Sequence, residues 1–350
     1  MVLLLAVLGA VLHPLLMLLG ILPVDTHALI SFLNAARSLI ADFMAWGLLS
    51  VLVIMGLFVL RGRLRSPHPA RDATQDPPER WSAPDRPKAV AVAITAYNDA
   101  EATAEAAAAF QVQDRVVQVI VVDNNSTDDT AELARAAGAT VVREPLQGYG
   151  FACIRGLTEA LKVSNAEVIV LTEGDGTFVA EDLDKFKAYI GQADMVIGTR
   201  VVHGLVENGS QMDYFFTWGN IAVATLLRLR FWNSQFLGTA RLSDVGCTYR
   251  AIRRDALERI LPELSVGGNH FSPHMMLVAL ERGLSVVEIP VTFRRRVGRS
   301  KGASQSFRKG LLTGLAMIWH IMTYSPQRAA RRHGPRRGAA MPGAIENRVA

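Results

Sequence analysis

The sequence has little of what marks a disulfide-stabilised or zinc-binding protein. Its 350 residues include only two cysteines, Cys153 and Cys247, which are far apart and match no metal-ligand spacing. We therefore expect both to be reduced, ordinary residues of a cytosolic domain. The eight histidines show no metal spacing either. His270 and His274 are four residues apart, but Pro273 between them argues against a helix that carries metal ligands.

Charge is also scarce at the N-terminus, where only Asp25, Arg37 and Asp42 are charged among the first 60 residues. Two apolar stretches, at about 2–22 and 41–60, each reach the roughly 20 residues that a membrane-crossing helix needs. A cleaved signal peptide requires positive charge at its start, and no Lys or Arg precedes Arg37. The pattern predicts two transmembrane helices within residues 1–65.

Arginine distribution predicts how these helices are oriented. Arg61, Arg63, Arg65 and Arg71 follow the second stretch, whereas the connection between the stretches holds only Arg37. The positive-inside rule then places the N-terminus and everything after residue 60 in the cytoplasm. We expect a multi-pass protein of the cell membrane with a cytoplasmic body.

Two segments around the body lack apolar periodicity. Residues 66–88 are rich in Pro, Asp and Arg, which is typical of a linker. Residues 327–350 place arginines among Gly, Ala and Pro, and they account for part of the net charge of +5. We interpret this segment as a basic disordered tail that contacts anionic lipid. Nucleic acid is a weaker alternative that nothing in the body supports, so no nucleic-acid partner is predicted.

The body alternates apolar strand patterns with helical patterns. Strands are expected at 89–95, 116–123, 140–143, 167–173 and 194–200, and helices at 99–110, 127–137, 151–161 and 181–190. Such alternation is typical of an α/β fold, a mostly parallel sheet with helices on both faces. Ligands of these sheets bind outside the carboxyl ends of the strands.

Two later apolar stretches carry basic and aromatic residues. They are residues 215–232, with Arg228 and Arg230, and residues 307–324, with Trp319. Each is too short or too interrupted for a confident membrane span, and both favour amphipathic helices in the membrane interface. Core helices of the body remain an alternative for both stretches, and a third transmembrane helix at 310–324 is a weaker one.

Polar side chains follow the first two strands. Tyr97, Asn98 and Asp99 end one, and Asp123 and Asn124 end the next. Taken singly, each of these residues suits the N-cap of the following helix. Because the carboxyl ends of parallel strands meet at one edge, the two clusters together predict a polar crevice that accepts a nucleoside.

LTEGDGTF at 171–178 places Glu173 and Asp175 at a third strand end. An acidic tight turn is one interpretation, and a metal site is the other. Carboxylates alone repel a diphosphate, but a divalent cation between Asp175 and the phosphates removes the repulsion. Gly174 and Gly176 would let the backbone approach such a ligand closely. Neither a phosphate-binding P-loop nor a GxSxG nucleophile turn is present.

Positive residues dominate the second half of the body. Arg200 ends the strand at 194–200, Arg250 follows Asp244 in SDVGCTYRAIRR, and Lys301 lies in RRRVGRSKG. A solvated or lipid-facing basic surface is one interpretation. Arginine clusters also bind phosphate groups bidentately, so the other is a site for phosphorylated substrates.

In this order, AYNDAEAT, VIVVDNNSTDDT, EGD, MVIGTR, SDVGCTYRAIRR and RVGRSKG resemble the motifs of glycosyltransferase family 2. The resemblance covers about residues 88–324 and is closest to the branch that glycosylates polyprenyl phosphates. It implies a GT-A fold, here over 89–306 with an interfacial helix at 307–326. It also implies inverting transfer of a sugar from a nucleotide sugar.

The same resemblance implies roles for individual residues. The residues implied to contact the nucleotide are Tyr97, Asp99, Asp123, Asn124, Glu173 and Gly174. The residues implied to contact the donor diphosphate and the acceptor phosphate are Arg200, Arg250 and Lys301. Asp175 and Thr177 would bind Mg²⁺ or Mn²⁺. Glu173 departs from the family, which usually has Asp there, and Thr217 and Trp218 stand where an Arg is usual.

The acceptor can be argued from what is missing. A hydroxyl acceptor must lose a proton to a positioned base, and the expected region offers only Asp244 without a neighbouring acid. A phosphate acceptor is already ionised and needs positive charge and alignment. The predicted reaction is therefore transfer from a UDP- or GDP-sugar to a polyprenyl phosphate at the cytoplasmic membrane face. Transfer to a hydroxyl of a glycolipid or glycan with Asp244 as base, and a catalytically silent scaffold, are the alternatives. The sugar and the oligomeric state stay open.

Overall fold

A computed structural model describes residues 88–210, 212, 214–231, 241–297 and 307–324, together with Ser38, Val53 and Gly56. Apart from Val53 and Gly56, the two predicted transmembrane stretches lie outside the described residues, as do the linker before Lys88, Lys301 and the basic tail. No helix within the described part of the chain has the length and apolar character that a bilayer crossing requires.

The body is built on a seven-stranded sheet in the order β3-β2-β1-β4-β6-β5-β7. Its strands are β1 (Val90–Ala96), β2 (Val116–Asp123), β3 (Thr140–Arg143), β4 (Val168–Glu173), β5 (Met195–Thr199), β6 (Arg250–Arg253) and β7 (Val286–Pro290). All neighbouring strands pair in parallel except β6, which runs antiparallel to both β4 and β5. The predicted mostly parallel α/β sheet is therefore confirmed.

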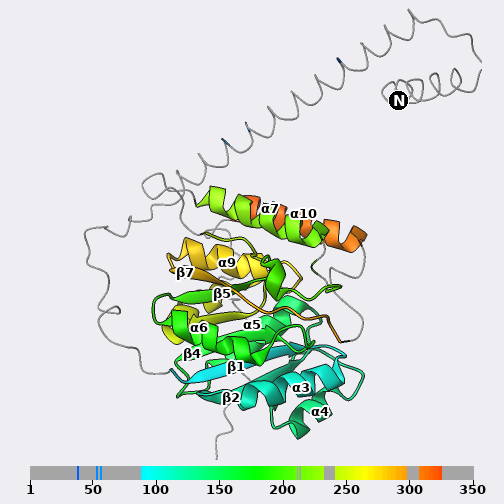
Figure 1. The fold of residues 1–350 in the computed structure, drawn as a ribbon. Helices are drawn as coiled ribbons and strands as arrows, with labels where there is room; N and C mark the ends of the chain where they lie inside the picture. Colours follow the sequence, from blue (N-terminus) through cyan, green and yellow to red (C-terminus); the bar gives the residue numbers. More distant parts are fainter. Residues whose placement is uncertain are drawn as a thin grey trace, which may run out of the picture. The chain divides into compact units, whose positions relative to one another are not determined.

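Helices cover both faces of this sheet (Figure 1). The α-helices are α3 (Ala100–Gln111), α4 (Thr130–Ala136), α5 (Tyr149–Ala160), α6 (Leu183–Ile190), α7 (Tyr214–Arg230), α8 (Arg254–Ile260), α9 (Phe271–Glu281) and α10 (Phe307–Thr323). Short 3-10 turns lie at Ala180–Asp182, His203–Leu205 and Leu261–Glu263. Every residue of β1 is buried, because both faces of that strand are covered.

Alternate residues of β1 face different layers. Val92 and Ile94 belong to the core cluster that includes Phe110 of α3 and Phe186 of α6. On the other face, a Cβ at Gly156 of α5 would lie 3.0 Å from the Cβ of Ala93. The absence of a side chain at Gly156 thus lets α5 approach the sheet closely.

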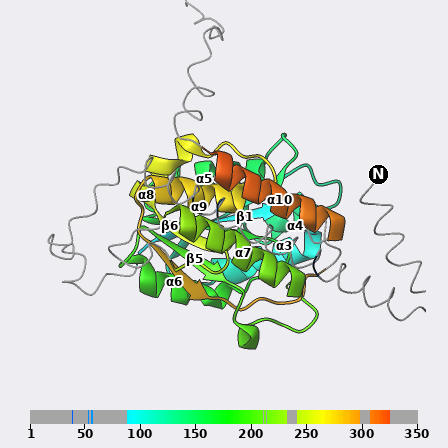
Figure 2. The same cartoon turned by 90° about the horizontal axis from the view of Figure 1, so that it is seen from above.

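Helices α7 and α10 lie side by side, and α10 also packs on α9 (Figures 1 and 2). Arg230 of α7 forms a 2.5 Å ion pair with Glu281 of α9 and donates to the carbonyl oxygens of Ile321 and Tyr324 at the end of α10. This one arginine therefore ties the three helices together.

A histidine pair joins α9 to α10. Nδ1 of the fully buried His274 lies 2.9 Å from Nε2 of His320. Burial lowers the pKa of His274 to about 3 and that of His320 to about 4, so both rings are neutral at pH 7. Our expectation that Pro273 opposes a helix here is corrected. Pro273 lies in the first turn of α9, where a missing N–H breaks no hydrogen bond within the helix.

Candidate functional site

The carboxyl ends of β1 and β4 lie side by side, since Thr95 pairs with Glu173 in the parallel ladder. A cavity of about 390 Å³ opens at this edge. Among the residues predicted from the sequence, those that line the cavity are Tyr97, Asp99, Asn124, Glu173, Asp175 and Arg200. The fold thus brings residues from four strand ends into one site.

Asp123 supports the turn after β2 without lining the cavity. Its Oδ1 accepts a 2.9 Å hydrogen bond from the backbone N–H of Ser126, and the residue is 7% exposed. Ser126 Oγ in turn accepts a bond from the backbone N–H of Asn98. Asp123 is not among the residues that line the cavity. The structure therefore gives this predicted nucleotide contact a role in holding the two turns together.

Asn124 lines the cavity and also fixes its rim. Its Nδ2 donates to the carbonyl oxygens of Glu144 and Leu146, and its Oδ1 accepts from the backbone N–H of Gly148. Gly148 has φ of +152°, a conformation that favours glycine. The segment before α5 is thereby held against the end of β2.

Glu173 has a defined partner, although it replaces the usual aspartate. The hydroxyl of Thr248 donates a 2.5 Å hydrogen bond to its Oε1. Burial, and then the nearby charge of Asp175, raise the pKa of Glu173 to about 7. The longer side chain is therefore anchored to the loop before β6.

Asp175 is nearly buried, at 4% exposed, and its two oxygens have different partners. Oδ1 accepts hydrogen bonds from the backbone N–H and the hydroxyl of Thr177, at 3.1 and 2.6 Å. Oδ2 lies 3.0 Å from Nη1 of Arg296, whose Nη2 lies 2.6 Å from Oδ2 of Asp99. Asp175 Oδ2 is thus already directed at a cation.

This arrangement fits a divalent ion that is held partly by substrate. No group of three His, Cys, Asp or Glu side chains that could hold a metal occurs within the described residues. Mg²⁺ commonly takes one or two carboxylates and completes its shell with substrate phosphates and water. Asp175 suits that mode of binding.

Thr177 and Gly174 lie outside the cavity lining. Thr177 is 1% exposed and orients Asp175 through the two hydrogen bonds described above. A Cβ at Gly174 would lie 2.8 Å from Oγ1 of Thr103, which donates a hydrogen bond to the Gly174 carbonyl. Glycine at 174 is therefore explained by close packing against α3 rather than by approach to a ligand.

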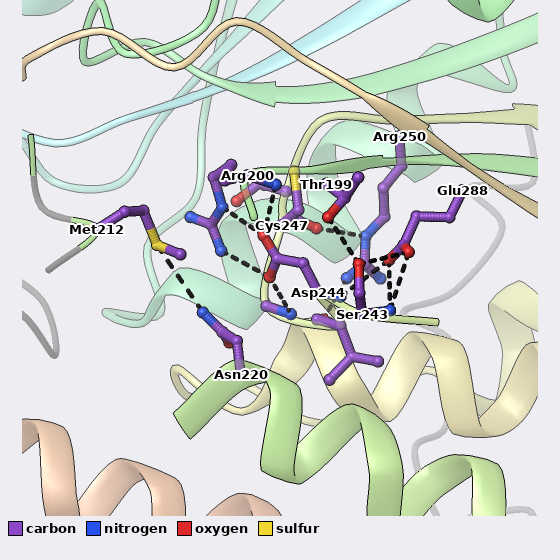
Figure 3. Close-up of polar contacts among 12 residues, drawn as sticks. Thr199, Arg200, Met212, Asn220, Ser243, Asp244, Cys247, Arg250 and Glu288 are labelled. Atoms are coloured by element: carbon purple, nitrogen blue, oxygen red, sulfur yellow. Dashed lines mark hydrogen bonds and ion pairs between the residues drawn. The ribbon is translucent and has the colours of Figure 1, made fainter. Parts of the chain in front are cut away.

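Asp244 is fully buried and holds Arg200 (Figure 3). Nε and Nη2 of Arg200 pair with its two oxygens at 2.7 and 2.9 Å, a bidentate geometry. Burial opposes the charge of Arg200, but the ion pair and hydrogen bonds with Asp244 raise its pKa above the ordinary value. The backbone N–H of Gly246 also donates to Asp244 Oδ1, so both carboxylate oxygens are occupied.

Glu288 of β7 supports the backbone of Ser243 and Asp244 (Figure 3). Its carboxylate accepts bonds from the backbone N–H groups of Ser243 and Asp244 and from the Ser243 hydroxyl, all within 2.9 Å. Burial raises the pKa of Glu288. Sequence analysis missed this residue, because a lone Glu in a short strand resembles a surface position.

Arg250 does not reach the cavity. It is 1% exposed, and its guanidinium donates to the carbonyl oxygens of Cys247, Ser272 and Val245, each at 2.8 Å (Figure 3). Our expectation that it contacts a substrate phosphate is corrected accordingly. A cation bonded to three backbone carbonyls fixes the loop before β6 against α9 and has no donor directed at the site.

The opposite wall of the cavity comes from helices α7 and α10. Phe216 and Asn220 line it from α7, Met212 lines it from the segment just before α7, and Thr313 and Met317 line it from α10. The sequence pattern predicted interfacial or core helices for both stretches and did not predict that they line the site. Nothing in their local pattern distinguishes the inward-facing side chains from the exposed ones.

Comparison with known proteins identifies the family. Residues 91–261 match the family model described as glycosyl transferase family 2. A dolichyl-phosphate hexose transferase of Haloferax volcanii is 31% identical over 214 residues, which are 61% of this chain and 86% of the relative. A polyprenol monophosphomannose synthase of Mycolicibacterium smegmatis is 29% identical over 205 residues, which are 56% of this chain and 74% of the relative.

A solved structure supports the fold. A crystal structure described only as a mycobacterial protein matches with a TM-score of 0.50 and 17% identity, covering 69% of this chain and 76% of that one.

Proposed function

The chain belongs to glycosyltransferase family 2 and is a hexosyl-transferring glycosyltransferase, and on that premise we propose that it transfers a hexose from a nucleotide sugar to a polyprenyl phosphate. One observation carries the proposal. A single cavity is lined both by the acidic strand ends, including Asp99 and Asp175, and by Phe216 and Met317 of the apolar helices α7 and α10. A charged donor and a lipid-linked acceptor can therefore meet in it. The names of the two relatives support the same acceptor class.

The donor half of the site uses the acids of β1 and β4. Tyr97 and Asp99 face the cavity, where they suit the base and ribose of a UDP or GDP group. Asp175, oriented by Thr177, would hold Mg²⁺ or Mn²⁺ together with the diphosphate. Such an ion neutralises charge on the departing diphosphate. This is the GT-A arrangement that the motifs imply.

The acceptor half uses fixed positive charge. Arg200 lines the cavity while its Nε and Nη2 are held by Asp244, so its guanidinium is oriented before any ligand arrives. A phosphate oxygen of the acceptor attacks C1 of the sugar, and the bond from C1 to the nucleoside diphosphate breaks. Attack opposite the leaving group inverts the configuration at C1. The acceptor needs no base, which agrees with an Asp244 whose oxygens are both occupied.

Exposed apolar side chains on α7 and α10 support the membrane part of the proposal. Trp218 and Trp319 are 65% and 71% exposed, and Leu312 and Leu315 are 65% and 53% exposed. Basic and aromatic residues on such helices suit the membrane interface. We place the site at the cytoplasmic face, with the N-terminal apolar stretches as anchors.

A labelled-sugar assay tests the acceptor. The full chain, supplied with UDP- or GDP-hexoses, polyprenyl phosphate and Mn²⁺, should form a product that is extractable into organic solvent and labile to mild acid. Labelling of a hydroxyl-bearing lipid or glycan instead, with no acid-labile product, would show that the acceptor is not a phosphate.

A further inference from the structure

We propose that Arg296 is an internal counter-cation that occupies the metal position of Asp175 and couples metal binding to donor binding. The inference rests on the proposed function for the identity of the donor. It does not follow from the motifs, because the sequence offers Arg296 only as one of several arginines in RRRVGRSKG.

The geometry of the three side chains carries the first step. The Arg296 guanidinium bridges Asp99 at 2.6 Å and Asp175 at 3.0 Å. The three side chains are 13%, 8% and 5% exposed. Removing one member of a buried ion pair is strongly unfavourable, since the remaining charge is left without compensation. The two acids therefore have a built-in cation when no ligand is present.

The backbone around Arg296 is attached to the same strand end. The N–H of Arg294 donates to the Thr177 carbonyl at 2.8 Å, and the N–H of Val297 donates to the Asp175 carbonyl at 3.3 Å. A Cβ at Gly176 would lie 3.2 Å from Cγ2 of Val297. Residues 294–297, which we call the strap, thus lie directly over the end of β4.

Within the strap, Arg296 is directed into the site while its neighbour binds elsewhere. The backbone N–H of Arg295 donates to the Glu207 carboxylate, and its Nη2 donates to the Asn208 carbonyl. Arg296 lines the cavity. Arg295 therefore offers a matched control, with the same charge on the same segment and a different environment.

Arg296 also has an unmet hydrogen-bonding need. Its Nε is buried and has no hydrogen-bond partner in the described structure. A buried donor without a partner is unfavourable, because it has lost its hydrogen bonds to water without replacing them. An anionic group entering the cavity, such as the diphosphate of the donor, would supply the missing acceptor.

Competition for Asp175 Oδ2 produces the coupling. A divalent ion needs this oxygen, which Arg296 already contacts, and no cluster of three potential ligands exists in the described residues. An ion arriving alone must displace Arg296 and gains few protein ligands. With the donor present, the diphosphate gives oxygens to the ion and an anionic partner to the displaced arginine. Each ligand then strengthens the binding of the other by the same factor.

The test is a titration of the full-length protein with Mn²⁺, followed by electron paramagnetic resonance, with and without UDP and GDP. For wild type we expect weak binding of Mn²⁺ alone and a strong gain on adding nucleotide. Arg296→Gln should bind Mn²⁺ alone about tenfold more tightly, and its gain on adding nucleotide should shrink about tenfold. Arg295→Gln should behave as wild type.

Two further variants test whether the charge of residue 296 and the carboxylate of residue 175 cause the effect. Arg296→Lys keeps the charge and should keep the affinity for Mn²⁺ low. Asp175→Asn, combined with Arg296→Gln in one double variant, should abolish the tight Mn²⁺ binding that Arg296→Gln alone creates. Unchanged or weaker binding of Mn²⁺ alone to a folded Arg296→Gln protein would overturn the proposal. The measurement with Mn²⁺ alone needs neither nucleotide nor sugar transfer, so a wrong acceptor in the proposed function leaves it valid.

Discussion

At the scale of single residues, Asp175 and Asp244 illustrate how burial separates similar side chains into different roles. Both are aspartates at the carboxyl edge of the sheet, and both are under 5% exposed. Asp175 keeps one oxygen directed into the site through Arg296, whereas Asp244 has both oxygens bound by Arg200 and Gly246. The first suits ligand binding and the second suits positioning of a neighbour.

Replacing Asp175 by asparagine should lower sugar transfer about 1000-fold, because a bound metal ion supplies several kcal/mol of transition-state stabilisation. Asp184→Asn, on the exposed face of α6, provides a control with the same chemical change. Transfer rates at saturating Mn²⁺ measure the effect. Near-normal activity of Asp175→Asn would rule out its role as a metal ligand.

Replacing Asp244 by asparagine distinguishes the two acceptor classes. If the acceptor is a phosphate, the variant loses half of a buried ion pair and its hold on Arg200, and we expect a fall of about tenfold to a hundredfold in kcat/KM. If Asp244 is the base for a hydroxyl acceptor, transfer is abolished while nucleotide affinity stays normal. Steady-state kinetics together with nucleotide binding separate these outcomes.

At the scale of elements, α7 and α10 have two functional faces. Phe216 and Met317 line the cavity, while Trp218 and Trp319 lie exposed on the outside. Polar ties to α9, through Arg230 and His320, hold the pair in place. The same two helices can therefore contact the acceptor on one side and lipid on the other.

Removal of both exposed tryptophans tests the outer face. Trp218→Ala combined with Trp319→Ala should raise the KM for polyprenyl phosphate in vesicles about tenfold, because apolar area is lost from the membrane contact. The KM for the nucleotide sugar should not change. Val112→Ala removes a side chain that is 81% exposed at the end of α3 and serves as the control. Equal effects of the two variants would argue against a membrane-facing role.

At the scale of the whole body, the sequence predicts the strands that are long and apolar, but not those that depend on tertiary context. The pattern predicted β1, β2, β4 and β5, whose buried faces require continuous apolar residues, and it also predicted the short strand β3. It missed β7, and it missed β6, four residues with arginines at both ends, because the Arg250 guanidinium is satisfied only by backbone carbonyls outside its own strand.

The candidate site was predictable to a similar degree. Strand ends identify Asp99, Glu173 and Asp175, because parallel strands converge at one edge. Among the many arginines, local sequence cannot tell that Arg250 is directed at backbone while Arg296 is directed at the acids. That choice depends on long-range packing of the loop before β6 and of the strap.

Stability of the body should depend on pH through the histidine pair of α9 and α10. The pKa values of about 3 for His274 and about 4 for His320 lie below the unfolded value of about 6.5. Unfolded chains therefore bind more protons below pH 6.5, and stability is lost as pH falls from there toward 4. Each histidine contributes about 2 kcal/mol of this loss between pH 7 and pH 5, so we expect a loss of about 4 kcal/mol for the pair, or a fall of about 10 °C in Tm.

Thermal unfolding of the solubilised full chain across this range measures the effect. His320→Gln should reduce the pH dependence, and His203→Gln, in the turn His203–Leu205, should not. A Tm that stays constant from pH 7 to pH 5 in the unmodified protein would contradict the neutral buried pair.

The reversed direction of β6 has a consequence for how the two walls of the site are encoded. Each parallel strand contributes the segment that follows it to this edge of the sheet. Because β6 is antiparallel, it contributes the segment that precedes it, residues 244–248. The strand-end residues Tyr97 and Asp175 precede Gly246 and Thr248 in the chain, and Arg296 follows both groups and pairs with the first. The acidic strand ends and their cation Arg296 are therefore encoded on opposite sides of the reversed segment, so a change in the acids during evolution requires a matching change about 120 residues later in the chain.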